Sequence, residues 1–186
     1  MFGTPFTLYP DWGLLILRIA LGVVFIAHGW PKLNPNGPMK GPAGFAAGLK
    51  QMGIPLPLFF AWVVALLETA GAVLLILGLG TCVLAIGLTV NMLVATFRAL
   101  LPAGATFTSM MGGPRWEEEF LLAAGSLALF LTGAGAISLD SLLGIAFPSA
   151  IVWFVAIVAL VILVFLLVTM NRGQQTATQQ PKPGQS

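Results

Sequence analysis

Two ionisable side chains, Arg18 and Glu68, interrupt otherwise apolar runs of the sequence. An ionisable group at membrane depth is costly unless it is paired, so its presence there is by default a sign of function. Counting about 1.5 Å per residue along helices that run in opposite directions predicts similar depths and a buried Arg18–Glu68 pair. Asp140, just beyond the fourth apolar run, is expected to join the pair. The pair either lines a site for a ligand head group or a proton, or only fixes the register of two helices.

A second set of polar side chains gathers near the ends of three apolar runs and comprises His28, Arg98, Glu117, Glu118 and Glu119. A histidine beside carboxylates and an arginine can relay a proton or hold a quinone carbonyl. Successive helical residues point about 100° apart, so one or two of the three glutamates can face a bundle. Carboxylates in a first turn also suit the positive end of the helix dipole, and a satisfied interfacial network is the alternative.

Few other side chains could support redox or metal chemistry. Asn91 lies in the middle of the third apolar run, where an amide commonly bonds to a neighbouring helix. One cysteine, Cys82, and one histidine exclude a dithiol motif, an Fe–S cluster and a haem held by two histidines of this chain. We therefore expect no intrinsic cofactor or metal. A haem or pigment on His28 is disfavoured, because a lone histidine near a helix end usually serves as a hydrogen-bonding residue.

The elements that carry these residues are five apolar segments. The chain of 186 residues is 58% hydrophobic and 8% charged, whereas soluble domains carry about 25% charged residues. Each segment has about 20 residues, the length that crosses a bilayer core, and the segments are 12–30, 57–79, 81–101, 116–136 and 147–170. This pattern predicts an all-α integral membrane protein, a four-helix transmembrane bundle plus a fifth, C-terminal transmembrane helix. A net charge of +2 without a basic stripe argues against nucleic acid as a partner.

The links suggest a simple division of the chain. We expect an N-terminal segment 1–11, a membrane core 12–142, an additional helix 147–170 and a disordered tail 171–186. The core includes a long loop 31–56, in which residues 45–52 could form a short helix on the membrane surface, and a Gly-, Thr- and Pro-rich link 102–115. The additional helix is apolar all round, which suits contact with lipid or with another membrane subunit.

Basic residues predict the orientation, since Lys and Arg favour cytoplasmic loops. With five spans, seven of the eight basic residues fall on one face; they are Lys32, Lys40, Lys50, Arg98, Arg115, Arg172 and Lys182. Four or six spans would scatter them over both faces. We therefore expect a bacterial-type inner-membrane protein with its N-terminus outside and its C-terminus in the cytoplasm.

Several short motifs resemble the DoxX family of membrane proteins over residues 12–142. They are Leu17-Arg18, Ala27-His28-Gly29-Trp30-Pro31-Lys32, Gly44-Phe45, Gly53-Ile54-Pro55, Glu68 followed by Gly71, Trp116-Glu117 and Leu139-Asp140. Their order and spacing, rather than any single motif, make the resemblance specific. By resemblance, the positions carried over are Arg18, His28, Lys32, Glu68, Glu118 and Asp140.

The resemblance implies a function as well as a fold. DoxX-like proteins are four-helix membrane proteins, and the related DoxD part belongs to thiosulfate:quinone oxidoreductase. The resemblance thus implies an accessory subunit of a membrane redox or electron-transfer complex, not catalytic on its own, that shapes a quinone site. The fifth helix would dock other subunits. The alternatives are a stand-alone membrane protein that binds a small molecule or a proton at the buried clusters, and a complex-assembly factor.

Overall fold

The computed structural model describes residues 10–100 and 116–179, with side chains described as far as residue 172. Within these residues the chain is helical and has no strand, which confirms the all-α prediction. The helices are α1 (Pro10–Leu33), α2 (Gly41–Gln51), α3 (Pro57–Leu66), η1 (Leu67–Gly71), α4 (Ala72–Leu77), α5 (Thr81–Leu100), α6 (Glu117–Thr132), α7 (Leu139–Leu142) and α8 (Ser149–Gln179). The segments 1–9, 102–115 and 180–186, for which we predicted a terminal segment, a link and a tail, lie outside the described residues.

Four helices of the described chain are long and apolar enough to cross a membrane: α1, the continuous helix α3–η1–α4, α5, and residues Ser149–Arg172 of α8. The predicted count of five spans is not confirmed. The segment 116–136 forms α6, which has 16 residues and begins with three glutamates. Such a helix falls just short of the roughly 17–25 residues that a spanning helix needs.

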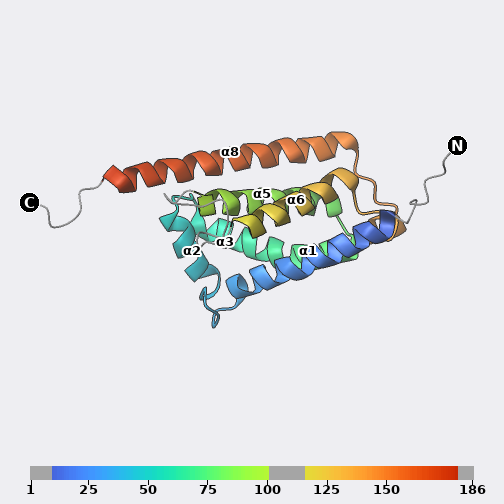
Figure 1. Ribbon diagram of the computed structural model, residues 1–186, viewed down its shortest axis with the longest axis horizontal. Coiled ribbons are helices and arrows are strands. Elements are labelled where there is room, and N and C mark those ends of the chain that lie inside the picture. The colour runs from blue at the N-terminus through green and yellow to red at the C-terminus, as the bar shows by residue number, and fades with distance from the viewer. Residues whose placement is uncertain (1–9, 101–115, 180–186) are drawn as a thin grey trace, which may run out of the picture.

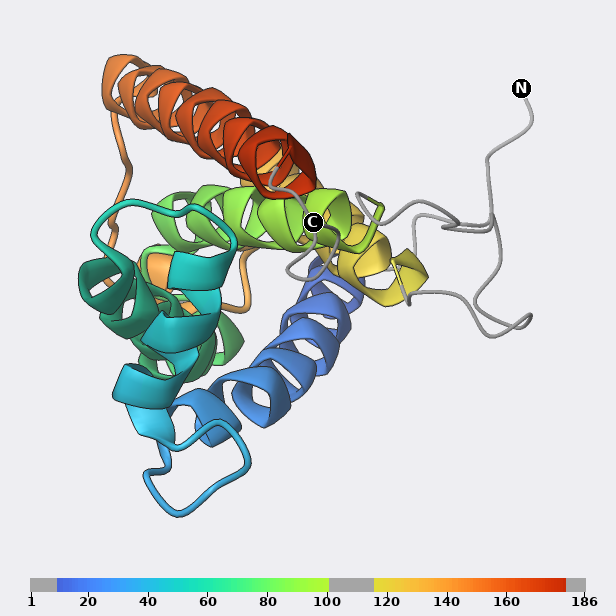
Figure 2. The same cartoon turned by 90° about the vertical axis from the view of Figure 1, so that its left-hand side faces the viewer.

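A helical bundle forms the body of the molecule. Helices α1, α4, α5 and α6 share a core that includes Leu21, Phe25, Leu75, Leu88 and Leu129. The helix α5 packs most extensively against α6, and α8 lies beyond this pair, on the far side of the bundle from α1 (Figure 1). Figure 2 looks onto the end of the bundle that carries α2, where α2 packs against α3.

The first predicted loop begins later than expected. Pro31 lies inside α1, which continues to Leu33, although a proline there has no N–H to donate to the carbonyl of Ala27. The short helix predicted at 45–52 is present within α2. The flanking residues Lys40 and Leu56 have left-handed backbone conformations, with φ of 53° and 48°. These turns direct α2 back over α3, where Leu49 is buried.

A single π-helical turn, η1, divides the second long helix into α3 and α4. The helix ends at Gly78, whose φ of 71° suits glycine. Gly80, with a φ of 67°, completes the tight link to α5. Isolated π turns occur frequently at functional sites, and this one contains Glu68.

The last helix, α8, lies at the periphery. Its large apolar side chains are exposed along most of its length, with Phe154 at 66% and Val161 at 60%, as expected for a helix that faces lipid. Further along the helix, Leu166 and Met170 are instead buried in a second cluster with Leu49 and Ala61. The tail predicted to be disordered from 171 instead continues the helix to Gln179.

Candidate functional site

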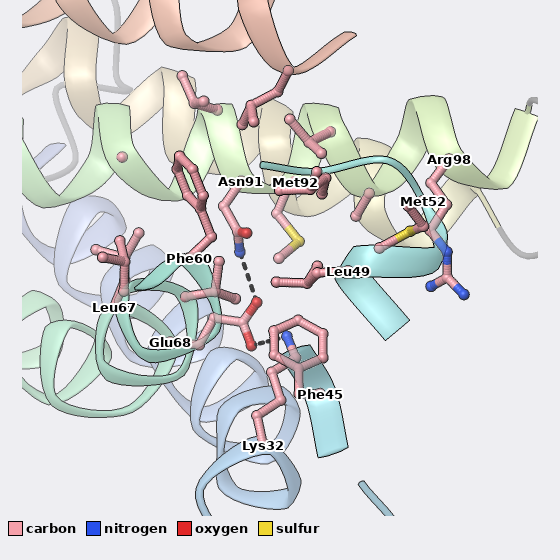
Figure 3. A pocket seen from close by; sticks show the side chains of 18 of the residues that line it. Lys32, Phe45, Leu49, Met52, Phe60, Leu67, Glu68, Asn91, Met92 and Arg98 are labelled. Atoms are coloured by element: carbon pink, nitrogen blue, oxygen red, sulfur yellow. Dashed lines mark hydrogen bonds and ion pairs between the residues drawn. The ribbon is translucent and has the colours of Figure 1, made fainter. Parts of the chain in front are cut away.

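Glu68 occupies the centre of the bundle and is fully buried. One carboxylate oxygen, Oε2, accepts from the ammonium group of Lys32 on α1, which forms a buried ion pair. The other oxygen, Oε1, accepts from the amide Nδ2 of Asn91 on α5 at 2.6 Å. Figure 3 shows both bonds meeting at Glu68, one from Asn91 above it and one from Lys32. Three helices thus contribute to one charged group, the Lys32–Glu68–Asn91 triad, which satisfies both carboxylate oxygens.

The close approach of α1 to η1 places Lys32 in this triad. A Cβ atom added at Gly29 would come within 2.8 Å of the Glu68 Cβ and 2.9 Å of its backbone carbon. Only glycine therefore lets the two backbones approach this closely. Phe45 of α2 places its ring 5.1 Å from the Lys32 ammonium, a cation–π contact. Lys32 is consequently held from two sides at the end of α1.

The predicted Arg18–Glu68 pair is wrong. Arg18 is fully buried, but it packs against Gly78 at the end of α4 and donates to the carbonyl of Ile137. Gly78 lies ten residues after Glu68, which is about 15 Å along a helix. The prediction compared estimated depths and took no account of how the helices are offset against each other. Two nitrogen atoms of Arg18, Nε and Nη1, have no hydrogen-bond partner among the described residues.

Asp140 lies near Arg18, as expected, rather than near Glu68. Asp140 and Arg18 both contact Gly78, and the two carboxylate oxygens of Asp140 accept from the backbone amides of Gly80 and Thr81 at 2.8 and 3.0 Å. Its own amide donates to the carbonyl of Gly78 at 2.9 Å. Asp140 therefore joins α7 to the link between α4 and α5 and serves mainly as a structural clamp.

The second predicted set is brought together in part. His28 Nε2 lies 3.4 Å from Glu118 Oε1, with both side chains partly exposed, and His28 Nδ1 lies 2.9 Å from the carbonyl of Val24. Arg98 and Glu119 line the same cavity as His28. Glu117 is not among the cavity-lining residues. Glu118 reaches His28 and Glu119 lines the cavity, which agrees with the prediction that one or two of the three glutamates face the bundle.

A cavity of about 480 Å³ lies beside the triad, within the range of roughly 300–1,000 Å³ typical of small-molecule sites. Most of its wall is apolar and comes from α2, α3, α5 and α8. Lys32, Glu68 and Asn91 supply polar groups at one side of it (Figure 3). An apolar cavity with a few convergent polar groups is the usual form of a binding site for a small, largely apolar molecule.

Comparison with known proteins places this architecture in a family. The DoxX family profile matches residues 13–101. The Bacillus subtilis (strain 168) protein named "Putative oxidoreductase CatD" is 33% identical over 131 residues, which are 69% of this chain and 84% of that protein. This chain belongs to the DoxX family. Inner membrane protein YphA of Escherichia coli (strain K12) is 33% identical over 135 residues, covering 68% of this chain and 87% of YphA. Inner membrane protein YqjF, also from Escherichia coli (strain K12), is 30% identical over 136 residues, or 72% and 93% of the two chains. No solved structure matches the chain.

The matched DoxX segment contains the whole triad and His28, whereas Glu118, Asp140 and α8 lie outside it. This DoxX-family chain is a membrane protein whose apolar helices contact lipid. The triad therefore lies within the part of the chain that the family profile matches, and α8 adds a further wall to its cavity.

Sequence reasoning from charge alone missed Lys32 as a partner of Glu68 and assigned it to a loop. A usable signal was present in the spacing along α1. Arg18, Phe25 and Lys32 recur every seven residues, and all three are buried. Residues seven apart lie on nearly the same helix face. Extending the buried stripe past Pro31 would have placed Lys32 inside the bundle. The π-helical turn had no comparable signal in the sequence, and Phe45 appeared only within the Gly44-Phe45 motif, without its contact to Lys32.

Proposed function

We propose that this DoxX-family protein is an accessory subunit of a bacterial inner-membrane redox complex and holds a quinone or quinol ring beside its buried triad. One observation carries the proposal: a fully buried carboxylate, paired with Lys32 and Asn91, faces an apolar cavity of about 480 Å³. The names of the relatives support the setting, since CatD is named an oxidoreductase and YphA an inner membrane protein.

The chemistry of the triad matches a quinone ring. The Lys32 ammonium and the Asn91 amide are donors that can bind a quinone carbonyl, and the Glu68 carboxylate can accept from a quinol hydroxyl. Reduction of a quinone takes up two electrons and two protons, so a site needs a proton route as well as a ring pocket. His28 lines the cavity and reaches Glu118 at the partly exposed surface, which offers such a route. The electrons would come from a partner subunit.

Substitution of Glu68 tests the ring site. Glu68→Gln removes the charge while keeping a similar shape, and we expect purified protein in detergent to lose at least about tenfold in affinity for ubiquinone-0, which is the loss of about 1.4 kcal/mol. Binding would be measured by calorimetry. Asp11→Asn is the matched control, because Asp11 accepts from Ala136 at the other end of α1 and an asparagine oxygen can still do so. Wild-type protein that binds no quinone, or Glu68→Gln protein that binds as tightly, would overturn the proposal.

Purification tests the accessory role. A tag on the C-terminus and extraction of native membranes in mild detergent should recover a stoichiometric partner, identified by mass spectrometry, with a flavin, haem or copper absorption spectrum. A single pure band without a chromophore would contradict the accessory role.

One observation favours a second candidate, a stand-alone protein that binds a small molecule or a proton. The cavity and the triad are both built by a single chain, so binding does not require another subunit to complete the site. Quinone binding that depends on Glu68, together with the absence of a co-purifying partner, would favour this candidate over the accessory subunit.

A further inference from the structure

The cavity beside the triad has two chemically different ends. Lys32, Glu68 and Asn91 form a polar end, and Ala159 and Ile162 of α8 contribute to an apolar end. The other polar residues of the lining are His28, Arg98 and Glu119. Figure 3 shows the ribbon of α8 across α5 from Glu68 and Lys32. A ligand that is polar at one end and apolar at the other would satisfy both ends.

The apolar wall of the cavity carries partly exposed side chains on α3 and α8. The helix α8 packs mainly against α5 and makes no comparable packing with α3. Phe59 and Val63 of α3 and Ile162 of α8 line the cavity but remain 60%, 41% and 39% exposed. Together with Ala159 they form what we call the α3–α8 groove. Leu166 packs in the cluster with Ala61 and closes the groove at the end nearer α2.

The surroundings of this groove are lipid rather than water. Its residues lie within the candidate spans Pro57–Leu77 and Ser149–Arg172, so their exposed apolar side chains face the hydrocarbon region. Within the triad, Glu68 is 0% and Lys32 9% exposed, and Asn91 is half-buried. A molecule dissolved in the bilayer can therefore reach the cavity sideways, without crossing an aqueous interface.

We infer that the α3–α8 groove is a lateral portal, and that the ligand is a quinone with a long isoprenoid or alkyl tail that lies in this groove. The inference rests on the proposed function and specifies the class of quinone. The ring enters first and reaches the Lys32–Glu68–Asn91 triad. The tail follows through the apolar end of the cavity and leaves between Val63 and Ile162 into the bilayer.

Photo-crosslinking in nanodiscs tests the portal. A decyl-tailed ubiquinone analogue with a diazirine in its tail is activated by light, and labelled peptides are mapped by mass spectrometry. We expect labels on α3 and α8 at the groove, and these labels should disappear when unmodified decylubiquinone is added in excess. Labels on lipid-facing positions outside the groove should persist, because they come from probe dissolved in the bilayer.

A matched pair of substitutions on α8 provides the control. Ala159→Phe fills the groove and should lower the competed labelling about tenfold, since the added ring occupies the space of the tail. Val161→Phe also introduces a phenylalanine, at a position that is 60% exposed and outside the cavity lining, and should leave the competed labelling unchanged.

Ubiquinone-0 has no tail, so its binding to wild-type protein reports on the proposed function alone. Binding of ubiquinone-0 with no competed label in the groove would overturn the portal and leave the ring site intact. Wild-type protein that does not bind ubiquinone-0 would overturn both the ring site and the portal.

Discussion

At the scale of single residues, the ion pair of Lys32 and Glu68 has the largest energetic consequence. Both side chains are buried, and each is the charged partner of the other. Removing one member of a buried pair leaves an uncompensated charge, which costs far more than the pair itself contributes. Replacing both together with neutral groups avoids that penalty.

The two single variants and their combination therefore form an informative cycle. Lys32→Met is expected to lower the free energy of unfolding by about 3–5 kcal/mol, and adding Glu68→Gln should recover much of that loss. Unfolding in detergent, followed by circular dichroism, measures the differences. Strictly additive losses in the double variant would show that the two side chains are not coupled.

Asp140 makes a different, structural contribution. Its carboxylate accepts from the amides of Gly80 and Thr81 at the start of α5. Asp140→Ala should therefore destabilise the protein by about 0.5–2 kcal/mol, the cost of losing a helix cap, while leaving quinone binding at Glu68 intact. Ser141→Ala, at an exposed position on the same short helix, is the control for thermal unfolding. An equal effect of the two substitutions would contradict the clamp.

At the scale of elements, the crossing of α1 over η1 determines whether the triad can form. Gly29→Ala places a methyl group within 2.9 Å of the η1 backbone, and we expect about 1–3 kcal/mol of destabilisation from overpacking. Gly13→Ala on the same helix has nothing within 4 Å and should be close to neutral. Thermal unfolding and ubiquinone-0 affinity would both be measured. Unchanged values for Gly29→Ala would show that α1 can shift without disturbing Lys32.

How far the elements could be predicted from sequence depended on the kind of signal. Long apolar runs located α1, α5 and the start of α8 to within a few residues, because the bilayer dictates the length of a spanning segment. The helix α8 continues nine residues past its predicted end at 170. Partners were harder to predict, since pairing depends on helix offset and rotation as well as depth. Arg18 was therefore assigned to Glu68, whereas Lys32 binds it. The continuation of α1 past Pro31 and the π-helical turn both depart from regular helix geometry. Packing between helices determines where such departures occur, and hydropathy carries no information about them.

At the scale of the whole molecule, α6 decides the topology. If α6, with its 16 residues, crosses the bilayer beside the four longer helices, the two termini lie on opposite sides of the membrane. If α6 does not cross, the two termini lie on the same side. The clustering of basic residues predicts the first arrangement, with the C-terminus in the cytoplasm. A C-terminal alkaline phosphatase fusion should be inactive, and a cysteine near the N-terminus should react with an impermeant maleimide in intact cells. Active phosphatase at the C-terminus would contradict the orientation, and termini on one side would exclude crossing by α6.

The π-helical turn at Leu67–Gly71 also affects how related sequences should be compared. Such a turn amounts to one inserted residue, which rotates everything beyond it by about 100° relative to a regular helix. A helical wheel that treats residues 57–77 as one regular helix will therefore place the residues on one side of the π turn on the wrong helix face. A homologue with a regular helix here would align with a one-residue gap. A glutamate at the aligned position would then point elsewhere, so sequence identity at Glu68 alone does not guarantee a shared triad.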